Sequence, residues 1–258
     1  LREVLKDVDD TAGIGEVLGT MEAGEQPAQE APTATCENLA ASLDLGATMV
    51  TSARPEIAGY FTPPNGQRAL LDLPKFCRVE LTISPTSDSD IKTEVWLPTE
   101  EWNGKFLTVG NGGWGGSIQY DALADGLRRG YATASSNTGH TTADASFAIG
   151  HPEKLIDFGY RAVHETVVQG KATIAALYGA APRYSYFNGC SGGGRQSFMA
   201  AQRYPEDFDA IIAGAPGYDR TDVAFQTLGM IRATHETPES FIPAEKYALI
   251  HRAAVHQI

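Results

Sequence analysis

A serine lies in the pentapeptide Gly189-Cys190-Ser191-Gly192-Gly193, which fits the pattern G-x-S-x-G between a strand-like and a helix-like segment. In this context the pattern indicates a nucleophilic serine that attacks a carbonyl carbon and forms an acyl-serine. The sharp strand-to-helix turn requires a positive φ at the serine and small residues two positions away on either side, which Gly189 and Gly193 are. We therefore expect Ser191 to be catalytic. The alternative is a glycine-rich helix start with a capping serine.

Backbone N–H groups are expected to stabilise the negative charge that develops on the carbonyl oxygen. The N–H of Gly192, at the start of a helix, is the expected first donor. The segment Asn-Gly-Gly-Trp-Gly-Gly at 111–116 follows another strand-like segment, and either Gly112 or Gly113 is expected to supply the second donor. A plain β-turn is the alternative. A phosphate-binding loop is disfavoured, because no Lys-Ser/Thr follows and the net charge is −12.

A serine hydrolase also needs a histidine base and an acid that orients it, and in the α/β-hydrolase order both follow the serine. The histidines after the serine are His235, His251 and His256. No predicted strand precedes any of them, so we expect none to be the base. Asp219 and Asp222 follow the last predicted strand and come one strand too early to be the acid.

The other histidines precede the serine. His164 falls inside a helix-like segment and is expected to be a packing residue with satisfied hydrogen bonds. His140 and His151 fall on the loop after a strand-like segment and are candidates to line the mouth of the site. Because no pair of histidines has the spacing of metal ligands, no metal site is expected.

These residues are positioned by alternating strand-like and helix-like segments. The strand-like segments are 76–83, 91–97, 105–110, 131–136, 185–188 and 208–216, the last of them expected to be buried. The helix-like segments are 36–43, 119–129, 156–179, the segment opened by the glycine turn at 189–205, and 237–258. The alternation predicts an α/β fold, a mostly parallel sheet with helices on both faces. The turn at 84–90 predicts an antiparallel hairpin at one edge.

Composition and charge narrow the range of partners. Residues 1–30 hold eight acidic and two basic side chains, and 24–35 is rich in Ala, Pro and Glu. We expect an acidic flexible tail at 1–34, with a short helix near 1–9. The net charge of −12 disfavours nucleic acid and anionic membranes as partners. The sequence contains no run of 18 apolar residues, so it predicts no membrane-spanning helix.

The motifs together resemble the tannase and feruloyl esterase family of α/β-hydrolases. The matching segments are LPKFCRV (73–79), VWLPTEEWNGKFLTVGNGGWGG (95–116), DFGYRAVH (157–164), YFNGCSGGGRQ (186–196) and QRYPEDFDAIIAGAP (202–216). The resemblance implies an α/β-hydrolase core and hydrolysis of aromatic acid esters of the feruloyl, chlorogenate or gallate type, with Ser191 as the nucleophile. The rival functions are an acyltransferase or peptidase with the same fold, and a catalytically idle binding or scaffold protein.

The resemblance also implies a pairing for the three cysteines, in which Cys36 bonds to Cys77 and Cys190 bonds to a cysteine just before the catalytic histidine. The family pattern continues beyond 241–258 into a lid with a calcium-binding, Asp-rich loop, a structural site, and then into the catalytic Asp and His. The resemblance therefore implies an incomplete core domain at 35–216, followed by the start of a helical lid at 217–258. Its Asp and His are expected to come from a C-terminal piece or a second chain. The isolated chain is expected to be nearly inactive. The family and the disulfide indicate a secreted or periplasmic protein.

Overall fold

The computed structural model describes residues 34–43, 45, 46 and 48–255. Its strands are β1 (Thr48–Glu56), β2 (Gly59–Phe61), β3 (Leu70–Leu73), β4 (Phe76–Ile83), β5 (Ile91–Pro98), β6 (Lys105–Val109), β7 (Ala132–Ser136), β8 (Tyr184–Cys190) and β9 (Ala210–Gly214). Its helices are α2 (Leu39–Ser42), α3 (Tyr120–Arg128), α4 (Pro152–Ile156), α5 (Ala162–Tyr178), α6 (Gly192–Arg203), α7 (Arg220–His235) and α8 (Ala244–Val255). The expected acidic tail lies outside the described residues except for Ala34, and so does His256.

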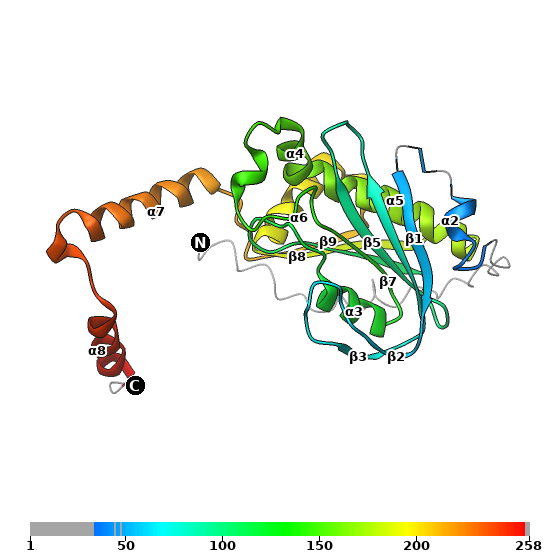
Figure 1. Ribbon diagram of the computed structural model, residues 1–258, viewed down its shortest axis with the longest axis horizontal. Helices are drawn as coiled ribbons and strands as arrows, with labels where there is room; N and C mark the ends of the chain where they lie inside the picture. The colour runs from blue at the N-terminus through cyan, green and yellow to red at the C-terminus, as the bar shows by residue number, and fades with distance from the viewer. Residues whose placement is uncertain (1–33, 44, 47, 256–258) are drawn as a thin grey trace, which may run out of the picture.

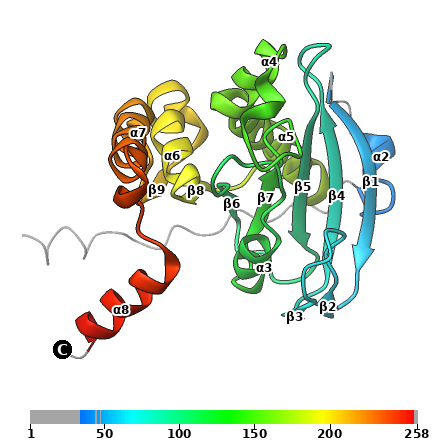
Figure 2. The ribbon, with the colours of Figure 1, turned by 60° about the vertical axis from the view of Figure 1, so that its left-hand side comes forward.

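Seven strands form one mixed sheet in the order β1-β4-β5-β7-β6-β8-β9, which can be followed in Figure 2 from β1 to β9, and β2 and β3 form a separate pair. The pairs β1–β4, β4–β5 and β5–β7 are antiparallel, and the pairs β7–β6, β6–β8 and β8–β9 are parallel. The predicted hairpin is confirmed as the antiparallel pair β4–β5. Its predicted place at the edge is wrong, because β1 pairs with β4 on the outside.

The order of the strands brings two loops together. From β6 the chain passes through α3 to β7, and from β7 it returns through α4 and α5 to β8, on the other side of β6. Because parallel crossovers are right-handed, α3 and α5 lie on opposite faces of the sheet, as Figure 1 shows. Val109 of β6 pairs with Asn188 of β8, so the loops after these strands leave the sheet side by side. Ligands bind at such reversal points in open α/β sheets.

Apolar side chains alternate along the central strands and build a core on each face of the sheet. Val95 and Phe106 pack with Val167 and Ile174 of α5 on one face. Trp96 lies in sequence between Val95 and Leu97, which both belong to this first core. Its side chain therefore points to the other face, where it packs with Leu123 of α3. β6, which the loop at 110–116 follows, contributes Phe106 to the first core and Val109 to the second, so the strand that carries this loop is packed on both faces.

A disulfide joins Cys36, just before α2, to Cys77 of β4, at a sequence separation of 41. Both cysteines are buried. The bond fixes the start of the described chain to the antiparallel half of the sheet. Cys190, the remaining cysteine, is free and exposed in the structure.

The strands β1, β2 and β3 and the helices α4 and α7 were not predicted individually from the sequence. β1 contains Arg54 and Pro55, which break the apolar alternation, and a proline is tolerated there because β1 is an edge strand. β2 and β3 are very short. The predicted helix at 156–179 is divided by a π-helical turn at Asp157–Arg161 and ends at Gly179, whose φ is +74°. α7 lies within the expected start of the lid at 217–258, where the sequence analysis predicted an individual helix only at 237–258.

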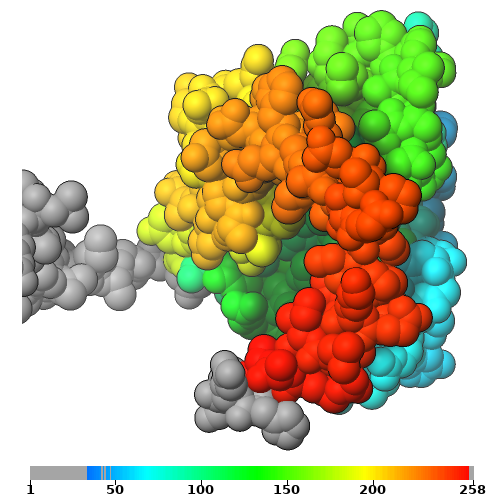
Figure 3. Space-filling model, turned by 90° about the vertical axis from the view of Figure 1, so that its left-hand side faces the viewer, coloured from blue at the N-terminus to red at the C-terminus, as the bar shows by residue number. Residues whose placement is uncertain are grey.

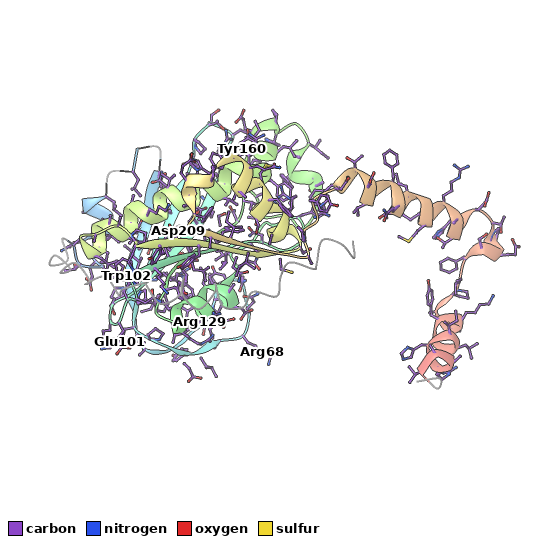
Figure 4. The ribbon with its side chains drawn as sticks, turned by 180° about the vertical axis from the view of Figure 1, so that it is seen from behind. Arg68, Glu101, Trp102, Arg129, Tyr160 and Asp209 are labelled. Atoms are coloured by element: carbon purple, nitrogen blue, oxygen red, sulfur yellow. A yellow bond between two sulfur atoms is a disulfide. The ribbon has the colours of Figure 1, made fainter. Side chains whose placement is uncertain are left out.

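The prediction that 208–216 forms a buried strand is wrong in its burial. β9 forms at Ala210–Gly214, and Asp209 fixes its start by accepting a hydrogen bond from the Ser185 N–H at 2.7 Å. Asp209 is labelled beside the sheet in Figure 4. β9 is nevertheless the edge of the sheet, and Ile212 is 63% exposed. Burial depends on what packs against a strand, and nothing in the described part of the chain covers this edge.

α7 and α8 make few contacts with the core. None of their residues is buried, and Figure 4 shows their side chains projecting on all sides. The exposed apolar side chains of α7 are Val223, Phe225, Leu228, Met230 and Ile231. An apolar surface of this kind is typical of a segment that another element covers. None of the helices in the described residues is long and apolar enough to cross a membrane.

Candidate active site

Ser191 occupies a strained turn between β8 and α6. It is the N-cap of α6, with φ +59° and ψ −112°, a conformation that is costly for any residue except glycine. Its N–H donates a hydrogen bond to the Gly214 carbonyl oxygen at 3.0 Å, and its own carbonyl oxygen accepts from the Arg195 N–H at 3.0 Å. The turn is thus held by β9 on one side and by the first turn of α6 on the other. The residue is exposed.

The glycines around Ser191 are required by close backbone contacts. A Cβ atom at Gly189 would overlap the backbone of Gly193, which is the steric reason expected from the G-x-S-x-G pattern. A Cβ atom at Gly192 would lie 2.7 Å from the Gly113 carbonyl oxygen, and one at Gly193 would lie 3.1 Å from the Asn111 carbonyl oxygen. The first turn of α6 therefore packs directly on the backbone of the loop after β6.

The loop at 110–116 is fixed at both ends. The Gly110 N–H donates to the Asn188 carbonyl oxygen at 2.9 Å, and the Gly116 N–H donates to the Asn137 carbonyl oxygen at 3.2 Å. Within the loop, the Gly115 N–H donates to the Gly112 carbonyl oxygen at 2.9 Å and closes a turn.

The N–H groups of Gly112, Gly113 and Gly192 donate to no acceptor among the described residues, so they are available to a ligand. They are the three that the sequence analysis named as candidate donors. The structure brings their loop against the first turn of α6, and the positive end of the helix dipole lies at the same place. The arrangement can stabilise an oxyanion next to Ser191. The choice between Gly112 and Gly113 stays open.

Asn111 and Gln196 were missed by the sequence analysis. The Asn111 side chain is buried and donates to the carbonyl oxygens of Ser117 and Ser136, both at 2.8 Å. Gln196, on α6, accepts from the Asn111 N–H at 2.9 Å and donates to the Asn111 side-chain oxygen at 3.1 Å. In the sequence, Asn111 comes directly before Gly112 and Gly113, and Gln196 comes shortly after another group of glycines. Such a local pattern does not reveal a contact between residues 85 positions apart.

In the part of the chain that the structure describes, the hydrogen bonds of the histidine side chains go to residues other than Ser191. His140 is buried and stacks on Phe147, with ring centroids 3.8 Å apart, and its burial lowers its pKa. The Nδ1 atoms of His151 and His164 each lie 2.7 Å from a carboxylate oxygen, of Asp88 and Asp207 respectively. His235 ends α7, His251 lies in α8, and both are exposed. His164 therefore has the hydrogen-bonded packing role expected of it.

The two aspartates after β9 belong to the start of α7. The Asp219 side chain caps the helix and accepts from the Asp222 N–H at 3.0 Å. Such capping is a common role for aspartate at the start of a helix. No cluster of three His, Cys, Asp or Glu side chains able to hold a metal occurs among the described residues.

A cavity of about 700 Å³ lies between the loop at 110–116, the π-helical turn and α7. Its apolar walls include Trp114, Leu155 and Phe158 from the core and Leu228 from α7. Figure 3 looks onto the side of the molecule on which α7 and α8, in orange and red, lie in front of the core. Trp114 directly follows Gly113, so the cavity adjoins the candidate oxyanion donors.

The model of the tannase and feruloyl esterase family matches residues 77–258, which include the Ser191 turn and the loop at 110–116. The chain belongs to the tannase and feruloyl esterase family. An uncharacterized esterase from Xanthomonas campestris is 45% identical over 249 residues, which cover 95% of this chain and 41% of that protein. A probable feruloyl esterase B-2 from Aspergillus fumigatus is 37% identical over 182 residues, which cover 70% of this chain and 34% of that protein.

Solved structures of the family share the fold. Feruloyl esterase B from Aspergillus oryzae superposes with a TM-score of 0.67 at 36% identity, over 70% of this chain and 36% of that one. Tannin acyl hydrolase from Aspergillus niger, at 23% identity and a TM-score of 0.57 over 73% of this chain, supports the fold alone. The sheet with helices on both faces is therefore an α/β-hydrolase core, as predicted. The chain spans about two fifths of the length of the first of these relatives and about a third of the others.

Proposed function

We propose that this chain carries the nucleophile and the oxyanion hole of a serine carboxylesterase that acts on esters of aromatic acids. The observation that carries the proposal is the strained Ser191 at the N-terminus of α6, next to three N–H groups without protein acceptors. The names of the relatives support esters of the feruloyl type. Chlorogenate and gallate esters belong to the same proposed class.

In the proposed reaction the Ser191 Oγ attacks the ester carbonyl carbon while its proton passes to a histidine. The N–H groups of Gly192 and of Gly112 or Gly113 donate to the oxyanion. The carbonyl re-forms, the C–O bond to the alcohol breaks, and the histidine returns the proton to the alcohol. Water then attacks the acyl-serine through the same oxyanion, which releases the acid and restores the serine.

We propose that the histidine and its aspartate come from a C-terminal piece or a second chain. Three features support this: the exposed edge strand β9, the exposed apolar side chains of α7, and the free thiol of Cys190 beside Ser191. A disulfide from Cys190 to that piece would hold it at the nucleophile. The chain by itself should then have negligible turnover, because the oxyanion hole and binding alone retain little of the activity.

No step of this proposal uses a metal. The family resemblance implies a structural calcium ion, but the described residues contain no group of acidic side chains that could bind it. The buried disulfide between Cys36 and Cys77 supports a secreted or periplasmic location, where disulfides persist.

The test begins with the intact mass of the natural protein before and after reduction, which shows whether a second piece is bonded to Cys190. The same preparation is then assayed on methyl ferulate, chlorogenate and methyl gallate, and treated with a fluorophosphonate. We expect hydrolysis, and a phosphonate adduct on Ser191. Ser191→Ala should abolish both, while Ser87→Ala, in an exposed turn, should change neither. Hydrolysis that persists in Ser191→Ala would overturn the proposal.

A further inference from the structure

The cavity beside the loop at 110–116 has two arginines in an otherwise largely apolar lining. Trp114, Phe158 and Leu228 form its walls, and Arg195 and Arg220 supply its charges. No acidic side chain lines it among the described residues. Positive charge that faces apolar walls is costly unless an anion compensates for it. The overall charge of the protein is negative, so this local excess of positive charge is not part of a general basic surface.

Arg195 is held rigidly on the core side of the cavity. It lies on α6, one helical turn after Ser191, and its guanidinium donates to the carbonyl oxygens of Phe158 and Gly159 at 3.1 and 3.0 Å. The guanidinium carbon also lies 4.5 Å from the centre of the Phe158 ring. These contacts leave its charge without a carboxylate partner, and the position of that charge is fixed relative to Ser191.

Arg220, the first residue of α7, brings a second positive charge to the same place. Both arginines line this one cavity, and burial and then the charge of Arg220 lower the pKa of Arg195. The Arg220 guanidinium lies beside Gly217, whose N–H donates to the Ser191 carbonyl oxygen at 3.3 Å. Among the ion pairs of the described residues, none involves either arginine. Arg220 is exposed, so its donors are accessible to a ligand.

We propose that this cavity is a subsite for a free carboxylate on the ester substrate, a proposal that rests on the proposed function. Arg220 donates hydrogen bonds to the carboxylate, and Arg195 contributes its fixed positive charge. The aromatic walls and the volume suit a ring that bears the carboxylate better than they suit a small inorganic anion. The preferred substrates are therefore esters that carry a second, unesterified carboxyl group, and neutral esters of the same acid bind less well.

The test compares two ligands that differ only at this group, chlorogenate and its methyl ester. Their binding to the natural protein with Ser191→Ala, which prevents turnover, is measured by calorimetry. We expect chlorogenate to bind about ten-fold more tightly or better, since hydrogen bonds to a charged partner are the strong ones. Arg220→Gln should remove this preference and leave the affinity for the methyl ester unchanged. Arg232→Gln, also on α7 but outside the cavity lining, should preserve it.

Equal affinities for the two ligands, no binding of either, or an equal loss of both in Arg220→Gln would overturn the subsite. Labelling of the unmutated protein by the fluorophosphonate separates this failure from that of the proposed function. If Ser191 is labelled and methyl ferulate is hydrolysed while no carboxylate preference exists, the esterase proposal stands and the subsite falls. If Ser191 is neither labelled nor needed for hydrolysis, both proposals fall.

Discussion

Asn111 and Gln196 exchange two hydrogen bonds across the site, from the Asn111 N–H to the Gln196 Oε1 at 2.9 Å and from the Gln196 Nε2 to the Asn111 Oδ1 at 3.1 Å. Asn111 directly precedes the candidate donors Gly112 and Gly113. Gln196 lies on the helix that begins after Ser191. The pair therefore sets the position of the loop relative to Ser191, the proposed nucleophile, and oxyanion stabilisation depends on that position.

Replacement of Gln196 by Ala should impair catalysis more than substrate binding. The variant leaves the buried Asn111 N–H without an acceptor and allows the loop to shift, and displacement of one oxyanion donor costs about 100-fold or more in kcat. We expect kcat to fall by this order with KM changed much less, measured on the natural protein with methyl ferulate. Gln202→Ala, on the exposed face of the same helix, is the control.

Loss of structure would also lower kcat, so the unfolding midpoint of Gln196→Ala must be measured alongside. A fall in kcat that is matched by the loss of folded protein, or a rise in KM alone, would contradict the positioning role. Gln196→Glu, which keeps an acceptor for the Asn111 N–H but loses one donor, should retain more activity than Gln196→Ala.

Two glycine-to-alanine variants should behave in opposite ways. A Cβ atom at Gly189 would overlap the Gly193 backbone, whereas one at Gly229 of α7 meets no atom within 4 Å. Gly189→Ala should therefore lower the unfolding midpoint and prevent phosphonate labelling of Ser191. Gly229→Ala should leave the midpoint of the core unchanged and raise helical circular dichroism, because alanine is favoured over glycine in a helix by about 1 kcal/mol. A Gly189→Ala variant with normal stability and labelling would show that the turn tolerates a side chain.

The disulfide between Cys36 and Cys77 should be the main covalent contribution to stability in this chain. Closing a loop of 41 residues restricts the unfolded chain and is worth about 4 kcal/mol in the loop-entropy description. We expect the double variant Cys36→Ser/Cys77→Ser to lose stability of this order in urea unfolding of the 258-residue chain. Cys190→Ser is the matched control, because its thiol is free and exposed here. A double variant as stable as Cys190→Ser would contradict the prediction.

The sequence was informative where a pattern is local. The alternation in 76–83 and 91–97 predicted β4 and β5 closely, since each strand carries its own apolar residues. The Ser191 turn was predicted for the same reason, because its steric requirement falls on residues only two positions away. The Cys36–Cys77 pairing followed from family resemblance rather than from the pattern itself.

Features that depend on distant residues were not predictable in this way. The Asn111–Gln196 pair joins two loops that are neighbours only because β6 and β8 pair in the sheet. The apolar residues of β9 indicated burial, but exposure is decided by what packs against a strand, and Ile212 stays exposed at the edge. The nearness of Arg195 and Arg220 depends on where the chain turns after β9, which no local pattern encodes.

His140 should make the stability of the protein depend on pH on the acid side of neutrality. Its ring is buried against Phe147 and faces the carbonyl groups of Trp114 and Thr142, and burial lowers its pKa, with Lys154 adding to the effect. A histidine with a lowered pKa binds fewer protons in the folded than in the unfolded chain. The contribution of the neutral His140 to the free energy of unfolding is therefore fully present above the ordinary histidine pKa of about 6.5. It is lost progressively as the pH drops below that value, until the folded-state pKa is reached.

The His140→Gln variant tests this pH dependence. We expect the free energy of unfolding, measured in urea at about pH 8 and about pH 5.5, to fall less in His140→Gln than in the unmodified chain. His251→Gln, exposed on α8, should show the unmodified pH dependence, and equal slopes for all three proteins would exclude His140 as the source.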